Sequence, residues 1–153
     1  MFIGETHSYA QPGWAEALLA AFDGPWAAVV PAIDNANPTG AASWASYLFD
    51  YGTWGPNRPS GEIADPLVYN TAYRRDVLMS LGDSLPVALD PCEETLWPLL
   101  WSRGHRAALA SDARIRHLNV GTFRTLIREK FCVGVVLSTH RSARWSQLRR
   151  RSR

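Results

Sequence analysis

The chain has 153 residues, of which 46% are hydrophobic and 20% charged, and its formal net charge is +2. This length fits one domain, and the composition predicts a packed core rather than a disordered chain. Because the net charge is so small, no overall field favours nucleic acid, and we expect no nucleic-acid partner.

The positive charge is concentrated at one end. The final segment, HRSARWSQLRRRSR, is rich in arginine and contains no acid. Such a tail suits phosphates or an anionic membrane surface, although a solvated helix end is the simpler interpretation.

Cysteine usage and hydropathy bear on the compartment. Cys92 and Cys132 are far apart and form no CxxC, which predicts neither a zinc framework nor a disulfide scaffold. The first residues lack the pattern of a secretory signal, and no segment approaches the roughly 18 apolar residues of a membrane span. We therefore expect a cytoplasmic protein, with a place at the inner face of the membrane open to it through the basic tail.

The first elements in chain order are a helix, a strand and a second helix. Apolar residues at i, i+4 and i+8 predict a helix over residues 11–22. Residues 24–33 read as a short buried strand. Residues 41–52 predict a helix with Trp44 and Leu48 facing inward.

The middle of the chain is broken by glycine and proline. The segment Gly52–Pro66 predicts a long loop without regular structure, of the kind that serves as a lid, a binding loop or a linker. Residues 67–82 look like a short strand passing into a helix, with Gly82 as its cap. Residues 91–104 predict another helix, stopped by Gly104.

The last part predicts strand and then helix. Residues 105–119 read as two short strands or one interrupted strand. With Asn119 as a possible N-cap, residues 122–151 are predicted to be mostly helical. Helices alternate with strands along the chain, which indicates an α/β fold.

Glu5, His7 and His117 are candidate metal ligands. Residues i and i+2 of an extended strand project to the same side, so Glu5 and His7 could face one ligand at a strand end. A carboxylate with an imidazole suits Mn²⁺ or Mg²⁺, which in turn can hold phosphate oxygens. For Glu5 and His7, ordinary surface positions are the alternative. His117, at the end of a later strand, is more typical of a structural hydrogen-bonding histidine and gains weight as a ligand only if it converges on the pair.

Two further groups are candidates. Glu93 and Glu94 stand at a probable helix start, where the macrodipole stabilises acids and where a carboxylate could also act as a general base. Asn70, Arg74 and Arg75 offer an amide and two guanidinium forks suited to phosphate, or simply surface ion pairs.

The order of these segments resembles a known family. An acidic-x-His stub is followed by "PGW", a helix, the strand "AAVVPAI", a Pro/Gly loop, "YNTAYRR", "EET" before "RGHR", and a strand that ends in histidine. This order, from about Phe2 to about Arg144, is similar to the second half of a family 2 glycosyltransferase with the GT-A fold.

The resemblance implies a role for each candidate ligand. Glu5 and His7 stand at the outer positions of the family's Asp-x-Asp motif, which holds a divalent cation and the diphosphate of the donor. Neither residue is Asp, and this departure puts metal dependence in doubt. His117 resembles a strand-end histidine that approaches the metal or the pyrophosphate.

The resemblance also implies a base and a cleft. Glu94, or alternatively Glu93, resembles the acid that takes the acceptor proton in inverting members. Asn70, Arg74 and Arg75 resemble the segment beside the acceptor and the donor sugar.

The implied protein is a partial GT-A fold. Residues 1–118 would be its acceptor and metal side, without the N-terminal nucleotide-binding strands, and residues 119–153 a basic helical extension. The implied reaction transfers a sugar from a nucleotide-sugar donor to a glycan or other hydroxyl acceptor. The chain alone would be inactive. Its uncovered sheet edge would be prone to self-association. A catalytically dead interaction module is the alternative. A hydrolase or a phosphate-loop enzyme is disfavoured, since neither G-x-S-x-G nor a Gly-rich phosphate loop occurs.

Overall fold

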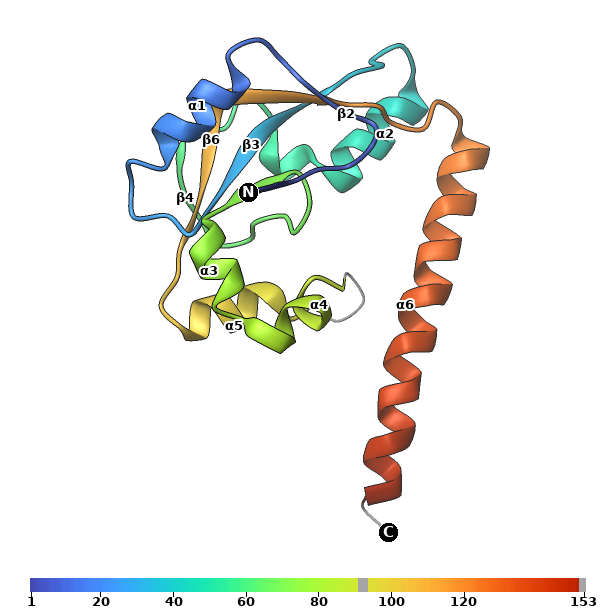
Figure 1. Ribbon diagram of the computed structural model, residues 1–153. Coiled ribbons are helices and arrows are strands. Elements are labelled where there is room, and N and C mark those ends of the chain that lie inside the picture. Colours follow the sequence, from blue (N-terminus) through green and yellow to red (C-terminus); the bar gives the residue numbers. More distant parts are fainter. Residues whose placement is uncertain (91–93, 152–153) are drawn as a thin grey trace.

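The fold is known from a computed structural model, which describes residues 1–90 and 94–151, with side chains as far as residue 142. Helices and strands alternate along the chain, as the sequence pattern predicts (Figure 1). In chain order the elements are β1 (Phe2–Ile3), β2 (Ser8–Ala10), α1 (Trp14–Ala21), β3 (Ala28–Asn35), α2 (Ala41–Asp50), the 3₁₀ turn η1 (Gly52–Trp54), β4 (Gly61–Ile63), β5 (Thr71–Tyr73), α3 (Arg75–Met79), the 3₁₀ turn η2 (Gly82–Ser84), α4 (Leu85–Ala88), α5 (Leu96–Ser102), β6 (Ala107–His117) and α6 (Phe123–Arg151).

The strands of the described residues form one six-stranded mixed sheet. Its order is β1-β5-β3-β6-β2, and β4 also pairs with β6. The two longest strands, β3 and β6, are parallel neighbours, whereas the other pairs are antiparallel. The α/β class expected from the sequence is therefore confirmed.

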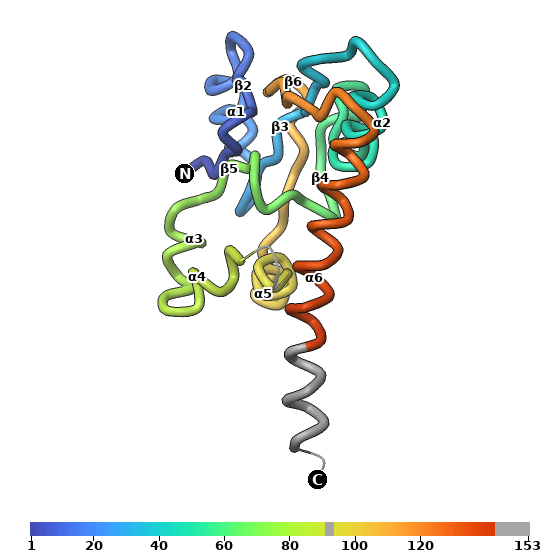
Figure 2. Tube along the Cα trace, turned by 90° about the vertical axis from the view of Figure 1, so that its right-hand side faces the viewer, coloured from blue at the N-terminus to red at the C-terminus, as the bar shows by residue number. Residues whose placement is uncertain are grey.

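Helices cover both faces of this sheet. Figure 2 shows α1 and α2 on opposite sides of β3 and β6, with α3, α4 and α5 gathered at one end. Alternate residues of β3 serve the two sides, because Val29 packs with Leu18 of α1 while Val30 packs with Leu78 and Leu100. Burying each such aliphatic side chain contributes about 1.5–3 kcal/mol.

Helix α2 turns a different face inward from the one expected. Trp44 and Leu48 are 44% and 62% exposed, so the prediction that they face the core is wrong. Ser43 and Tyr47 are buried instead, and the Tyr47 hydroxyl donates a hydrogen bond to the carbonyl of Ile33. A hydrogen bond to β3 thus fixes the rotation of the helix, which apolar periodicity alone does not reveal.

The Gly52–Pro66 segment is more regular than expected. It contains η1 and the strand β4, whose residues Gly61 and Ile63 pair with Leu109 and Ala107 of β6. Gly61 has φ of +146°, a conformation that an L side chain rarely adopts. Glycine therefore admits the strand here rather than breaking it.

The C-terminal elements settle two open alternatives. Residues 107–117 form one strand, with an irregularity in its pairing to β3 between Pro31 and Ala32. Helix α6 begins after Thr122, whose Oγ accepts the N–H of Thr125, so Asn119 is not its N-cap. Figure 1 shows α6 running along one side of the rest of the molecule, residues 1–118, which will be called the body. Among the described residues, no helix combines the length and the apolar character that crossing a membrane requires.

Candidate functional site

Strand pairing brings distant histidines to one edge of the sheet. Because β3 and β6 are parallel, their carboxyl ends coincide, and Asn35 is the register partner of His117. Strand β2 pairs antiparallel to β6 with Ser8 opposite His117, which places the preceding residue, His7, beside it. The two imidazole rings lie with their centroids 4.4 Å apart. Ligands of open α/β sheets bind at this kind of edge.

Glu5 joins the two histidines through a turn rather than a strand. The N–H of Ser8 donates to the carbonyl of Glu5, so the Glu5–His7 segment is bent and not extended as expected. One ligand atom from each of Glu5, His7 and His117 nevertheless lies within 4.8 Å of the others. The three residues will be called the Glu–His–His cluster.

The orientation of His117 is set by Asn119. The Asn119 amide nitrogen donates to Asn35 Oδ1 and to the His117 carbonyl, which leaves its oxygen 3.1 Å from His117 Nδ1. That oxygen can only accept, so Nδ1 carries the hydrogen. His117 therefore points Nε2 towards Glu5.

His117 Nε2 is an orphaned buried atom. His117 is only 6% exposed, and its Nε2 makes no hydrogen bond with any described residue. It lies 3.4 Å from Glu5 Oε2, which is close enough for an ion pair when the ring is protonated. In the neutral ring, Nε2 presents a lone pair to a carboxylate, and this arrangement is stable when a cation lies between them.

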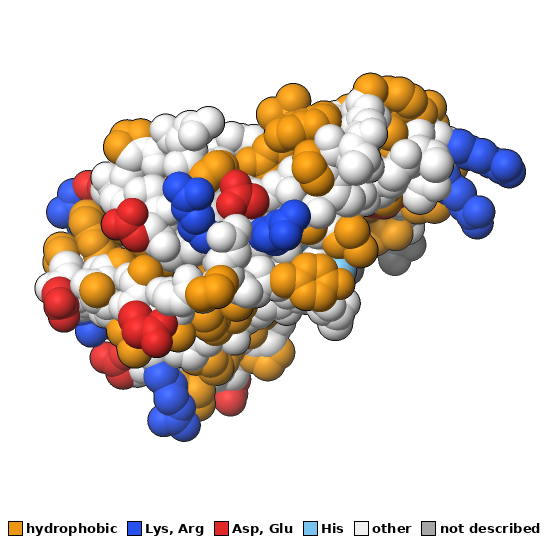
Figure 3. Space-filling model, turned by 90° about the horizontal axis from the view of Figure 1, so that it is seen from above, with side chains coloured by type: hydrophobic (Ala, Val, Ile, Leu, Met, Phe, Trp, Pro, Cys, Tyr) orange, Lys and Arg blue, Asp and Glu red, His pale blue; other side chains and the backbone are white. Residues whose placement is uncertain are grey.

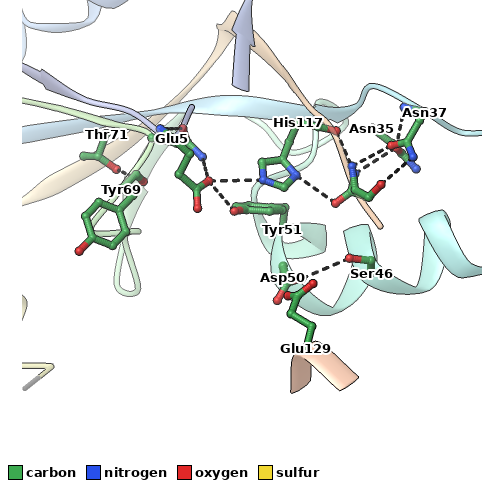
Figure 4. A network of polar contacts seen from close by, with 12 residues as sticks. Glu5, Asn35, Asn37, Ser46, Asp50, Tyr51, Tyr69, Thr71, His117 and Glu129 are labelled. Carbon is green, nitrogen blue, oxygen red and sulfur yellow. Dashed lines mark hydrogen bonds and ion pairs between the residues drawn. The ribbon is translucent and has the colours of Figure 1, made fainter. Parts of the chain in front are cut away.

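Glu5 is held from two sides. The Asn70 amide donates to Glu5 Oε2 at 2.5 Å, and its oxygen accepts the Glu5 N–H. The Tyr51 hydroxyl donates to the same Oε2 at 2.7 Å, and Figure 4 shows Glu5, Tyr51 and His117 meeting there. Asn70 is fully buried with φ of +55°, a strained conformation that asparagine tolerates better than most residues.

These contacts keep Glu5 ionised. Partial burial raises the pKa of Glu5, but His117, when it is protonated, and the hydrogen bonds from Tyr51 and Asn70 outweigh this effect and lower the pKa to about 2. Burial together with Glu5 raises the pKa of Tyr51 far above its usual range, so Tyr51 remains a donor. The cluster thus offers a permanent carboxylate and two imidazoles.

This donor set fits a divalent cation. A carboxylate and imidazoles bind Mn²⁺ and other first-row ions, and a hydrogen-bonded ring nitrogen opposite the ligating one is the usual support for a metal-bound histidine. The orphaned Nε2 of His117, backed by Asn119, meets that description.

The cluster opens into a cavity of about 370 Å³. Helix α6 forms part of its wall, and Lys130 of that helix contacts both carboxylate oxygens of Asp50 and one of Glu129. Burial lowers the pKa of Lys130, but these hydrogen bonds and charges raise it overall, so its ammonium stays charged. The cavity therefore has mixed charge, with acids slightly in excess.

The predicted base does not lie in this cavity. Glu94 lines another cavity, beside Trp97 and Trp101, and forms an exposed ion pair with Arg141 at 2.8 Å. Arg141 follows Val133, the last α6 residue in the wall of the first cavity, by eight positions, which is about 12 Å along the helix. Glu93 lies outside the described residues.

The three residues predicted to bind phosphate or sugar, Asn70, Arg74 and Arg75, have different roles in the structure. Asn70 belongs to the site, but as the residue that positions Glu5. Arg74 turns away and donates to the carbonyl of Phe22, at the end of α1, and to those of Gly24 and Trp26 in the segment that follows. It also lies over the Phe22 ring, and a cation suits this helix end. Arg75 is exposed at the start of α3.

Sequence reasoning missed several members of the site. Tyr51, Asp50 and Lys130 carry no motif, and Asn119 was assigned to a helix cap. The one local signal for Asn119 was its place two positions after His117, because a polar residue there can reach the ring of a histidine at a strand end. The contacts of Tyr51 with Glu5 and of Lys130 with Asp50 join residues 46 and 80 positions apart.

Comparison with models of known families, with curated proteins and with solved structures yields no match for this chain.

Proposed function

We propose that the Glu–His–His cluster binds a divalent cation, Mn²⁺ or Mg²⁺, and forms the diphosphate side of a site for sugar transfer from a nucleotide-sugar donor to a hydroxyl acceptor. The observation that carries the proposal is the buried Nε2 of His117, which has no hydrogen-bond partner among the described residues and lies 3.4 Å from Glu5 Oε2. The resemblance of the segment order to family 2 glycosyltransferases supplies the reaction class.

The residues of the site would act by fixing the position of a bound cation. A bound cation would supply positive charge that offsets a leaving diphosphate. Glu5, His7 and His117 would hold it, Asn119 and Asn70 would keep His117 and Glu5 in position, and preorganised charge of this kind is often the largest catalytic contribution.

One observation favours a second candidate function. Glu94 is paired with Arg141, which lies about 12 Å along α6 from the wall of the cavity. A general base must lie within hydrogen-bond reach of the hydroxyl that it deprotonates. This separation favours a module that keeps the cation site and uses it for binding rather than for transfer.

Cation binding is tested by titrating the 153-residue chain with Mn²⁺ and following free Mn²⁺ by electron paramagnetic resonance. We expect one site, weakened at least about tenfold by Glu5→Gln or His117→Gln, in line with the loss of a metal ligand. His105→Gln, which changes a histidine outside the cluster, is the matched control. Binding that survives both cluster substitutions would refute the site.

A second titration separates the two candidate functions. UDP, GDP and dTDP are added with and without Mn²⁺, and calorimetry records binding. Binding that requires both the cation and Glu5 supports a diphosphate site. A chain that binds Mn²⁺ but no nucleotide supports the binding module.

A further inference from the structure

The chain divides sharply by charge. Residues 1–118 contain 13 of the 14 acidic residues and seven of the 16 lysines and arginines, so their formal charge is −6. Residues 119–153, which are almost entirely α6, contain the other nine basic residues and one acid, so their charge is +8. The net charge of +2 therefore conceals two opposed halves.

One face of α6 is both basic and apolar. Arg124, Ile127, Arg128, Phe131 and Val135 follow the i, i+3, i+4, i+7, i+11 spacing of a single helix face. The side chains of Ile127, Phe131 and Val135 are 68%, 71% and 47% exposed, and both arginines are exposed. These five residues, which will be called the stripe, extend about 17 Å along the helix.

Contacts with the body show that this face points outward. Lys130 pairs with Asp50 of α2, and Arg141 pairs with Glu94, so the side of α6 that carries them lies against the body. Leu126 and Leu137 on the same side are less exposed than the stripe. Figure 3 shows basic side chains projecting from the end of the molecule where α6 begins, close to exposed apolar ones.

We propose that this outward face of α6 binds an anionic lipid surface, with the helix lying in the interface. A helix with apolar side chains and arginines on one exposed face buries the former at the level of the acyl chains and places the latter among the headgroups. The basic sequence that follows, through Arg149, Arg150 and Arg151, adds attraction to the same surface. The proposal does not depend on the cation site.

The chemistry of the stripe favours a lipid surface over a second copy. Its arginines could also meet exposed acids of another chain, such as Asp83 and Asp112. An anionic bilayer, however, places charged headgroups directly beside acyl chains, which matches a face that combines arginines with Ile127, Phe131 and Val135.

The test is flotation of the full chain with vesicles. Phosphatidylcholine vesicles are compared with vesicles that also contain phosphatidylserine, at low and at high salt. We expect binding to the anionic vesicles to be at least about tenfold stronger and to weaken as salt is added, because screening shortens the range of the attraction.

Two double variants test whether the stripe is the part of the chain that binds the vesicles. Arg124→Gln with Arg128→Gln is expected to weaken binding about 25-fold, at about fivefold for each arginine near the surface. Ile127→Ser with Phe131→Ser is expected to weaken it at least about tenfold. Matched controls on the body are Leu19→Ser, which changes a residue 70% exposed on α1, and the pair Arg103→Gln with Arg114→Gln. Far-UV circular dichroism checks that each variant is folded.

Three results would overturn the proposal. They are equal binding to neutral and anionic vesicles, binding that both stripe variants retain, and absence of flotation at low salt. In the last case, dimerisation in lipid-free buffer that Ile127→Ser with Phe131→Ser removes would identify the stripe as an interface between copies of the chain.

Discussion

At the residue scale, the site depends on asparagines as much as on its charged groups. Asn119 fixes which nitrogen of His117 faces Glu5, and Asn70 holds the Glu5 carboxylate from a buried, left-handed backbone conformation. Each amide donates through its nitrogen and accepts through its oxygen. An ionised carboxylate can only accept, and a hydroxyl has a single oxygen for both purposes. Asn70 is fully buried and acts through Glu5, whereas Asn119 also lines the cavity.

Substitution of Asn70 separates strain from hydrogen bonding. Asn70→Ala and Asn70→Gly both remove the amide that binds Glu5, but only alanine is strained at φ of +55°. We expect Asn70→Ala to lower the free energy of unfolding by about 2–4 kcal/mol and Asn70→Gly by about 1 kcal/mol less. Urea denaturation measures both. Equal losses would show that the backbone conformation carries no strain.

The ionisation of Glu5 predicts a pH dependence of stability. The folded pKa of about 2 lies below the unfolded value of about 4.5, so the unfolded chain binds the proton first as pH falls. The stability from Glu5 is therefore complete above about pH 4.5 and is lost as pH falls towards 2, an effect of about 2 kcal/mol after allowance for solvent screening.

Denaturant titrations between these pH values, with EDTA present, measure this effect. Glu5→Gln should flatten the dependence, whereas Glu16→Gln, which changes an exposed carboxylate on α1, should leave it as in the wild type. An unchanged slope in Glu5→Gln would contradict the low pKa.

At the scale of elements, hydrogen bonds override local preference. Tyr47 rotates α2 by bonding to β3, and Arg74 joins the start of α3 to the end of α1. The Gly52–Pro66 segment likewise gains a strand because β6 offers it a free edge. Short elements in this chain therefore follow their long-range partners.

Hydrogen exchange can test the revised description of that segment. Residues 57–60 are exposed and belong to no helix or strand, so their amides should exchange quickly. Residues 61–63, paired with β6 and including the buried Ile63, should exchange measurably more slowly. Exchange at 61–63 as fast as at 57–60 would show that β4 does not form in solution.

At the scale of the whole molecule, the cavity limits what the site can hold. Ligand pockets commonly measure about 300–1,000 Å³, so the 370 Å³ beside the Glu–His–His cluster is at the small end of that range. A diphosphate fits this volume, and most of the lining residues are polar or charged, which suits phosphates better than a base. Affinity for a complete donor would then come mostly from phosphates in a solvent-screened cleft.

We therefore expect this chain to bind UDP-, GDP- and dTDP-sugars weakly and to transfer none at a useful rate. Calorimetry with Mn²⁺ present should give dissociation constants nearer about 1 mM than about 1 µM. Inorganic pyrophosphate is the matched control and should bind about as well as the nucleotide sugars. Micromolar binding of a nucleotide sugar, or clear transfer, would contradict this account.

Local sequence alone determined the features that depend on neighbours in the chain. The helices α1 and α6, the strand β3 and the strand end at His117 follow from periodicity, and Glu5 and His7 were identifiable by ligand type. The tertiary structure decided everything that joins distant segments: the meeting of Glu5 and His7 with His117, the hydrogen bonds from Asn70 and Tyr51 to Glu5, and the separation of Glu94. The physical reason is that strand pairing and buried hydrogen bonds act between residues that sequence spacing does not relate, and these contacts outweigh the local preferences of short segments.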